Sequence, residues 1–124
     1  MRYIILIHSN PASRQIWESF SADEQAAGFQ EYGRIVDALT ASGELIVTHA
    51  LADPSLTKRI VSIEDGQAMT TDGPFPEMKE LLAGFFLVEC ESQDRAIEIA
   101  AMIPEAPLGL VEVRPIMSLE PPEL

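Results

Sequence analysis

The sequence predicts a single α+β domain with the ferredoxin-like plan, to which a β-hairpin has been added. Strand-like and helix-like segments follow one another in the order strand, helix, strand, hairpin, strand, helix, strand, as expected for two βαβ halves separated by a hairpin. The chain has 124 residues, of which 47% are hydrophobic, so it is large enough for one core of its own. We therefore expect one domain over residues 1–124, with a loose tail from about residue 118.

The first 20 residues are predicted to hold one strand. Residues 2–8 are apolar or β-branched on both faces, which is typical of a central strand that is covered on both sides. Residues 9–20, which include Pro11, Trp17 and Phe20, are expected to be irregular.

A helix is predicted from Ser21 to about residue 42. Ser21 and Glu24 have the spacing of a capping box, in which each side chain accepts a hydrogen bond from the backbone of the other residue. Gly43 suits the left-handed backbone that ends many helices. The predicted apolar stripe of this helix consists of Phe29, Tyr32, Ile35, Val36 and Leu39.

The middle of the chain is predicted to hold a strand and the added hairpin. Residues 44–50 form the second strand, and residues 53–55 form a turn. Residues 59–64 and 67–71 flank the dipeptide Asp65-Gly66, which is typical of two-residue hairpin turns.

The last third is predicted to form a strand, a helix and a strand. After the strand over residues 84–91, Ser92 is expected to cap a helix that runs to Ile103 and ends before Pro104. The final strand is expected over residues 108–117, and a ferredoxin-like sheet would place it beside the first strand. The side chains of the helix that face inward are predicted to be Ala96, Ile99, Ala100 and Ile103.

Both faces of the predicted sheet are apolar. Phe85 and Leu87 lie on one face of their strand, whereas Phe86, Val88 and Cys90 lie on the other. Both helices should cover the same face, so the other face needs a different cover. A second copy of the chain is the simplest one, and we therefore expect a homodimer.

The stretch from Asp72 to Glu80 reads Asp-Gly-Pro-Phe-Pro-Glu-Met-Lys-Glu and follows the predicted hairpin. Gly73 and Pro74 restrict the backbone, so the position of the Asp72 carboxylate is fixed. Two interpretations remain open. Asp72 either accepts hydrogen bonds from its own turn, or acts beside Phe75 as an acid/base group or a ligand clamp.

This stretch resembles the signature of the DGPF-domain proteins within the wider YCII-related group, from which only Pro76 and Met78 depart. Residues 2–7, 84–89, 94–100 and 109–115 resemble the strands and the helix of that family. The resemblance implies a dimeric α+β barrel. The YCII-related group is thought to use a His–Asp pair, but neither histidine of this chain matches the position of that group's histidine.

The remaining polar candidates lie at strand ends and on the last strand. His8 and His49 end the first two strands, where a histidine is either available for proton transfer or simply exposed. Glu112 and Arg114 alternate with apolar residues and could approach His8. On a covered face, such charges are either paired or line a cavity.

Composition excludes several classes of function. The net charge of −12 and the absence of a Lys/Arg cluster argue against nucleic-acid binding. Cys90, the single cysteine, has no disulfide partner, and no apolar run or cleavage pattern marks a membrane or secreted protein. We therefore expect a cytoplasmic protein with Cys90 in its core. Metal-ligand spacing, phosphate-binding loops and Cys-x-x-Cys pairs are absent from the sequence, so no cofactor or metal is expected.

These observations favour a small-molecule-binding protein or a cofactor-independent acid/base enzyme of the lyase or isomerase type. Asp72 would act as the base, His8 as an acid or orienting group, and Arg114 as an anion clamp. The other predicted substrate-binding residues are Glu112, Phe75 and Lys79. The alternative is a non-catalytic regulatory or protein-interaction module, which the resemblance to DGPF proteins links to transcription-related partners.

Overall fold

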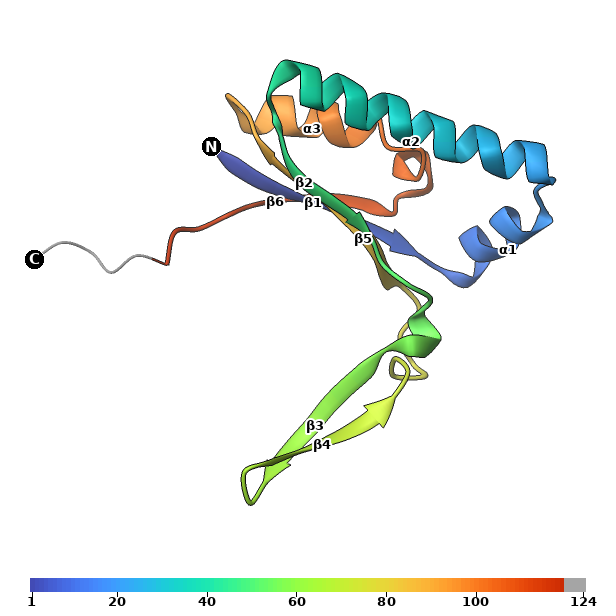
Figure 1. The fold of residues 1–124 in the computed structure, drawn as a ribbon, viewed down its shortest axis with the longest axis vertical. Coiled ribbons are helices and arrows are strands. Elements are labelled where there is room, and N and C mark those ends of the chain that lie inside the picture. Colours follow the sequence, from blue (N-terminus) through green and yellow to red (C-terminus); the bar gives the residue numbers. More distant parts are fainter. Residues whose placement is uncertain (120–124) are drawn as a thin grey trace, which may run out of the picture.

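The computed structural model describes residues 1–119 and has an α+β architecture (Figure 1). Its elements are β1 (Arg2–Ser9), α1 (Pro11–Ser19), α2 (Ala22–Ser42), β2 (Leu45–Ala50), β3 (Lys58–Glu64), β4 (Gln67–Asp72), β5 (Leu81–Glu89), α3 (Gln93–Ala101) and β6 (Val111–Pro115), with short 3-10 turns at Pro54–Leu56 and Ala106–Leu108. The α+β class predicted from the sequence is confirmed.

Four strands form the main sheet in the order β2-β5-β1-β6, and every neighbouring pair is antiparallel. The first and last strands of the sequence, β1 and β6, lie side by side, as a ferredoxin-like plan requires. Among the described residues, strands β3 and β4 pair only with each other and form a separate two-stranded sheet. Asp65 and Gly66 join them with positive φ angles of 51° and 76°, the backbone of a two-residue hairpin turn.

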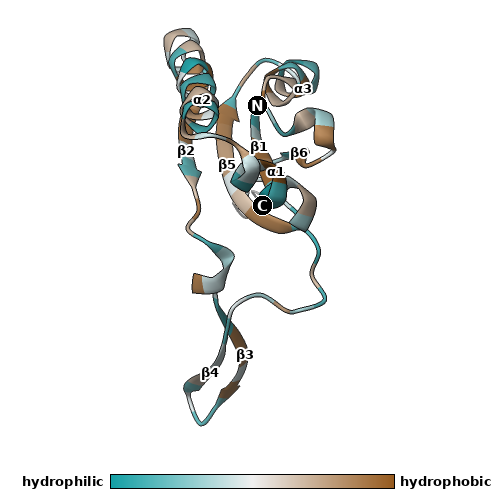
Figure 2. Cartoon of the chain, turned by 90° about the vertical axis from the view of Figure 1, so that its right-hand side faces the viewer, coloured by the Kyte–Doolittle hydropathy of each residue, from teal (hydrophilic) through white to brown (hydrophobic). Residues whose placement is uncertain are grey.

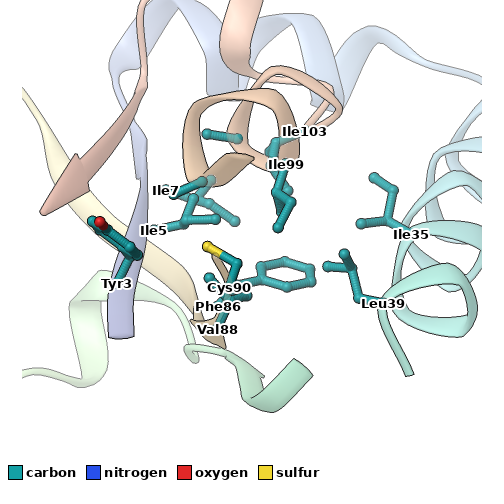
Figure 3. Packing of buried hydrophobic residues seen from close by; sticks show 12 residues of the cluster. Tyr3, Ile5, Ile7, Ile35, Leu39, Phe86, Val88, Cys90, Ile99 and Ile103 are labelled. Carbon is teal, nitrogen blue, oxygen red and sulfur yellow. The ribbon is translucent and has the colours of Figure 1, made fainter. Parts of the chain in front are cut away.

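The core lies between one face of the main sheet and the helices α2 and α3 (Figures 1 and 3). Alternate residues of β1 and β5 point into it. The buried cluster also takes in Ile35 and Leu39 of α2. The predicted inward-facing residues of the last helix are all buried, as are Phe86, Val88 and Cys90. Neither α2 nor α3 lies over the opposite face of the sheet.

Residues 11–19 form a helix, so the expectation of an irregular segment over residues 9–20 is wrong. Asn10 and Ser13 form a capping box in which the Asn10 side chain accepts a hydrogen bond from the Ser13 backbone at 2.8 Å. Trp17 of this helix packs edge-on against Phe29 at a ring distance of 5.4 Å. Phe29 was expected among the buried residues of α2. It is instead 69% exposed, and its ring contacts Trp17 of α1.

Element ends differ from the predictions at several places. Strand β5 begins at Leu81, three residues before the predicted start. Helix α3 ends at Ala101, although Ile103 beyond it is still buried. Residues 108–110 belong to a turn, with Gly109 at a φ of 73°, so β6 begins only at Val111. The predicted loose tail lies mostly outside the described residues. Within residues 1–119, no helix combines the length and the apolarity needed to cross a bilayer.

Arg95 connects the first turn of α3 to the start of β2. Its Nε and Nη2 atoms donate hydrogen bonds to the two carboxylate oxygens of Glu44, each at 2.9 Å. This two-point geometry is the strongest form of an Arg–carboxylate contact. The hydrogen bonds from Arg95 hold the pKa of Glu44 below its usual value.

We expect Arg95→Met to lower the free energy of unfolding at neutral pH by about 1 kcal/mol. Because the pKa of Glu44 is lower in the folded chain, its contribution is present above the unfolded pKa of about 4.3 and is lost as the pH falls through the folded value. Melting curves of both proteins from neutral to acidic pH should therefore converge once the pH has fallen below the lowered pKa of Glu44. A difference that is independent of pH would show that the methionine disturbs packing instead.

Gly84 is predicted to be required for the pairing of β2 with β5. A Cβ atom at this position would lie 2.9 Å from the backbone oxygen of His49 and 3.4 Å from the Cα atom of Ala50. Gly84→Ala should therefore destabilise the fold by about 1–3 kcal/mol. Gly33→Ala is the matched control, because nothing lies within 4 Å of its added Cβ and alanine favours a helix, so denaturant unfolding should show a gain of about 0.5–1 kcal/mol.

Candidate functional site

The uncovered face of the main sheet, called here the outer face, has an apolar centre and polar ends. Residues opposite one another in an antiparallel ladder share a face, so the register of the four strands places them in two rows across the sheet. The rows are His49–Phe85–Leu6–Glu112 and Val47–Leu87–Ile4–Arg114. Four of the five apolar members belong to the two central strands. The polar members all belong to the edge strands.

His8 and Glu112 form an ion-pair or hydrogen-bond contact at one edge of this face. His8 Nε2 lies 2.8 Å from Glu112 Oε1, and the backbone N–H of His8 donates to the Leu110 carbonyl at 2.8 Å. The His8 side chain is 21% exposed and the Glu112 side chain 58% exposed. A carboxylate that orients an imidazole while solvent can still reach the ring is suited to proton transfer.

A pocket of about 210 Å³ lies beside this pair. Its lining residues are His8, Glu80, Gly109, Leu110, Val111 and Glu112. Glu80 is the last residue of the Asp72–Glu80 stretch and stands immediately before β5. No role for Glu80 was predicted from the sequence, although its position at the end of the Asp72–Glu80 stretch was the available signal. The pocket therefore contains three ionisable side chains within a short distance of an apolar sheet face.

Arg114 lies in the row next to Glu112 and opposite Ile4. Within residues 1–119, its guanidinium takes part in none of the ion pairs, whereas Glu112 is paired with His8. The expected approach of Glu112 to His8 is therefore present. Arg114 remains exposed and is available to an anion.

Asp72 lies at the base of the β3–β4 hairpin, where it pairs with Lys58. The Asp72 side chain is 79% exposed. Gly73, with a φ of 76°, donates its backbone N–H to the Thr57 carbonyl at 2.6 Å, so the predicted restriction of this turn is present. The partner of Asp72 is Lys58 rather than Lys79.

Phe75 also belongs to the hairpin base, because the guanidinium of Arg59 lies 4.0 Å from the centre of its ring. The Asp72–Glu80 stretch is thus divided between two places in the structure. Its first residues belong to the hairpin base, and its last residue lines the His8 pocket. In the described part of the chain, the structure brings His8 and Glu112 together and records no contact between either of them and Asp72.

His49 lies on the outer face at the opposite end of its row from Glu112, with its ring edge toward Phe85 at 5.9 Å. Cys90 is buried in the core, as predicted. No cluster of three His, Cys, Asp or Glu side chains that could hold a metal ion occurs among residues 1–119. The polar side chains in the two rows of the outer face are an imidazole, a carboxylate and a guanidinium group.

Asp72→Asn is expected to change the melting temperature by less than about 3 °C, because exposed ion pairs contribute little to stability. Lys58→Gln should have an effect of similar size, and the double variant should show little coupling between the two positions. Differential scanning calorimetry provides the measurement. Early unfolding of Asp72→Asn would show that the carboxylate is a structural part of the turn.

Comparison with known proteins gives a matching family, one similar sequence and one similar solved structure. The family described as the YCII-related domain matches residues 1–120. An uncharacterised protein of Rhizobium meliloti (strain 1021) is 29% identical over 126 residues, covering 100% of this chain and 98% of that protein. A solved structure of 5-chloro-2-hydroxyhydroquinone dehydrochlorinase (TftG) from Burkholderia phenoliruptrix AC1100, in complex with 2,5-dihydroxybenzoquinone, aligns with a TM-score of 0.47 and 18% identity over 94% of each chain.

Proposed function

The chain belongs to the YCII-related domain family, and on that premise we propose that it binds a small organic anion on the outer face. Either binding alone or cofactor-independent acid/base chemistry of the lyase or isomerase type would take place there. The observation that supports this proposal is the His8–Glu112 pair beside a pocket, at the edge of an apolar sheet face.

In this proposal each polar group has a separate task. His8 donates or accepts the proton, and Glu112 orients the imidazole. Arg114 binds the anionic group of the ligand. The apolar centre of the face, represented by Leu6 and Phe85, binds the apolar part of the same molecule.

Asp72, Phe75 and Lys79 form a second group of proposed site residues, with Asp72 as the base. These three residues would act on the same ligand only if the base of the hairpin lies over the outer face, either of the same chain or of a second copy. Support comes from Glu80, because the end of the same signature already lines the His8 pocket.

We further propose that two copies pack their outer faces together as a dimeric α+β barrel and enclose the site between them. Ile4, Leu6, Phe85 and Leu87 are only half-buried in one chain, and removing such surface from water favours association. The acidic surface, with a net charge of −12, fits a cytoplasmic protein that does not bind nucleic acids.

The binding proposal is tested with benzoate, a small anion with an apolar body, and with benzamide as its uncharged analogue. In heteronuclear NMR spectra, millimolar benzoate should shift the backbone signals of β1 and β6 around His8, Glu112 and Arg114. Benzamide should cause smaller shifts, because it lacks the charge that Arg114 would bind.

Arg114→Gln should weaken the response to benzoate by about tenfold, as expected for the loss of a charged hydrogen bond. Arg34→Gln is the matched control, since Arg34 is paired with Glu31 on the exposed side of α2 and should not affect binding. Equal responses to benzoate and benzamide, or shifts confined to other surfaces, would contradict the assignment of an anion site to the outer face.

A further inference from the structure

The β3–β4 hairpin, residues 58–72 and called here the arm, projects away from the rest of the molecule (Figure 1). Every residue of both strands is exposed. A two-stranded ribbon that packs on nothing is at best marginally stable in water. The arm therefore lacks a surface that would complete its packing.

The two faces of the arm differ in polarity. From the pairing of β3 with β4, one face holds Ile60, Ile63, Ala68 and Thr70, with the Lys58–Asp72 pair at its base. Ile60 is 62% exposed and Ile63 is 64% exposed, and Figure 2 shows hydrophobic residues along β3. Met69 is the apolar member of the other face, which otherwise holds Arg59, Ser62, Glu64, Gln67 and Thr71. Val61 lies in a bulge between the two registers.

The base of the arm is fixed by several contacts. The Gly73 N–H donates to the Thr57 carbonyl, Lys58 pairs with Asp72, and Arg59 lies over the Phe75 ring. The arm therefore has a set direction in which its apolar face does not pack on its own domain.

Charge indicates which partner fits. The chain has 20 acidic and 8 basic residues, but the arm has three acidic and two basic ones, and the two outer-face rows have one of each. The apolar surfaces of the arm and of the outer face are thus nearly neutral, whereas the remaining surface is strongly acidic. Charge repulsion between two copies is therefore weakest where the arm or the outer face takes part in the contact, and depletion of charge is typical of the centre of a protein interface.

We propose that the arm is exchanged between two copies of this chain, so that each copy lays its Ile60–Ile63 face on the other. The proposal rests on the dimer of outer faces described above and adds a second area of contact to it. A two-fold axis makes the exchange reciprocal, so that neither arm stays uncovered. The Lys58–Asp72 pair lies on the same face of the arm, so the exchange would bring the start of the DGPF signature into the interface.

The test compares two double variants by sedimentation equilibrium. Ile60→Lys with Ile63→Lys places two charges on the apolar face of the arm. Ser62→Lys with Gln67→Lys places two charges on the opposite face. Both variants reduce the net negative charge equally, so general repulsion between copies cannot account for a difference between them.

The dissociation constant of the dimer should be at least about tenfold higher for the first variant than for the parent. For the second variant it should equal that of the parent. Their melting curves should show that both remain folded, because these side chains are all exposed. If the first variant does not fold, the single variants Ile63→Lys and Gln67→Lys provide the same comparison.

If both double variants dimerise as well as the parent, the exchange of the arm is overturned, but the dimer of outer faces stays in place. A monomeric parent at high micromolar concentration would overturn both.

Discussion

The central constraint on this molecule is that β1 and β5 are apolar on both faces. One set of alternate side chains packs against α2 and α3 and forms the core. The other set, which includes Leu6 and Phe85, lies on a face that no helix of the described chain covers. Because strand pairing fixes the register, this same face receives Glu112 and Arg114 from β6 and His49 from β2. The position of the proposed site is therefore a consequence of how the sheet buries its first face.

Much of the fold could be predicted from the sequence because its signals are local. The Ser21–Glu24 capping box, the left-handed Gly43 and the Asp65-Gly66 turn each act within a few residues, and each is present in the structure. Helix α1 was missed because it is short and none of its nine residues is buried, so it is not part of the core around which the other elements were predicted. Its signal was Asn10 at the N-cap with Pro11 directly after it and Ser13 at the third helical position. Phe29 was placed in the core for the same reason, since its contact with Trp17 exists only if α1 does.

The contacts of the candidate site also differ in how far they could be inferred from the sequence. The approach of His8 to Glu112 could be inferred because it follows from the neighbouring positions of the first and last strands. The partners of Asp72 and Phe75 could not be inferred. They are Lys58 and Arg59 of β3, and the sequence alone does not show which residues lie opposite one another across the hairpin. The role of Glu80 depends on the course of residues 73–80 through space, which no periodic pattern encodes.

The neighbours of β1 have a consequence for how the chain is made. Among the described residues, β1 pairs with β5 and β6, and both of these strands are synthesised long after it. Contacts between such distant segments form slowly, and an apolar strand without partners is prone to aggregate. During translation β1 therefore stays without its partner strands until β5 and β6 have been made.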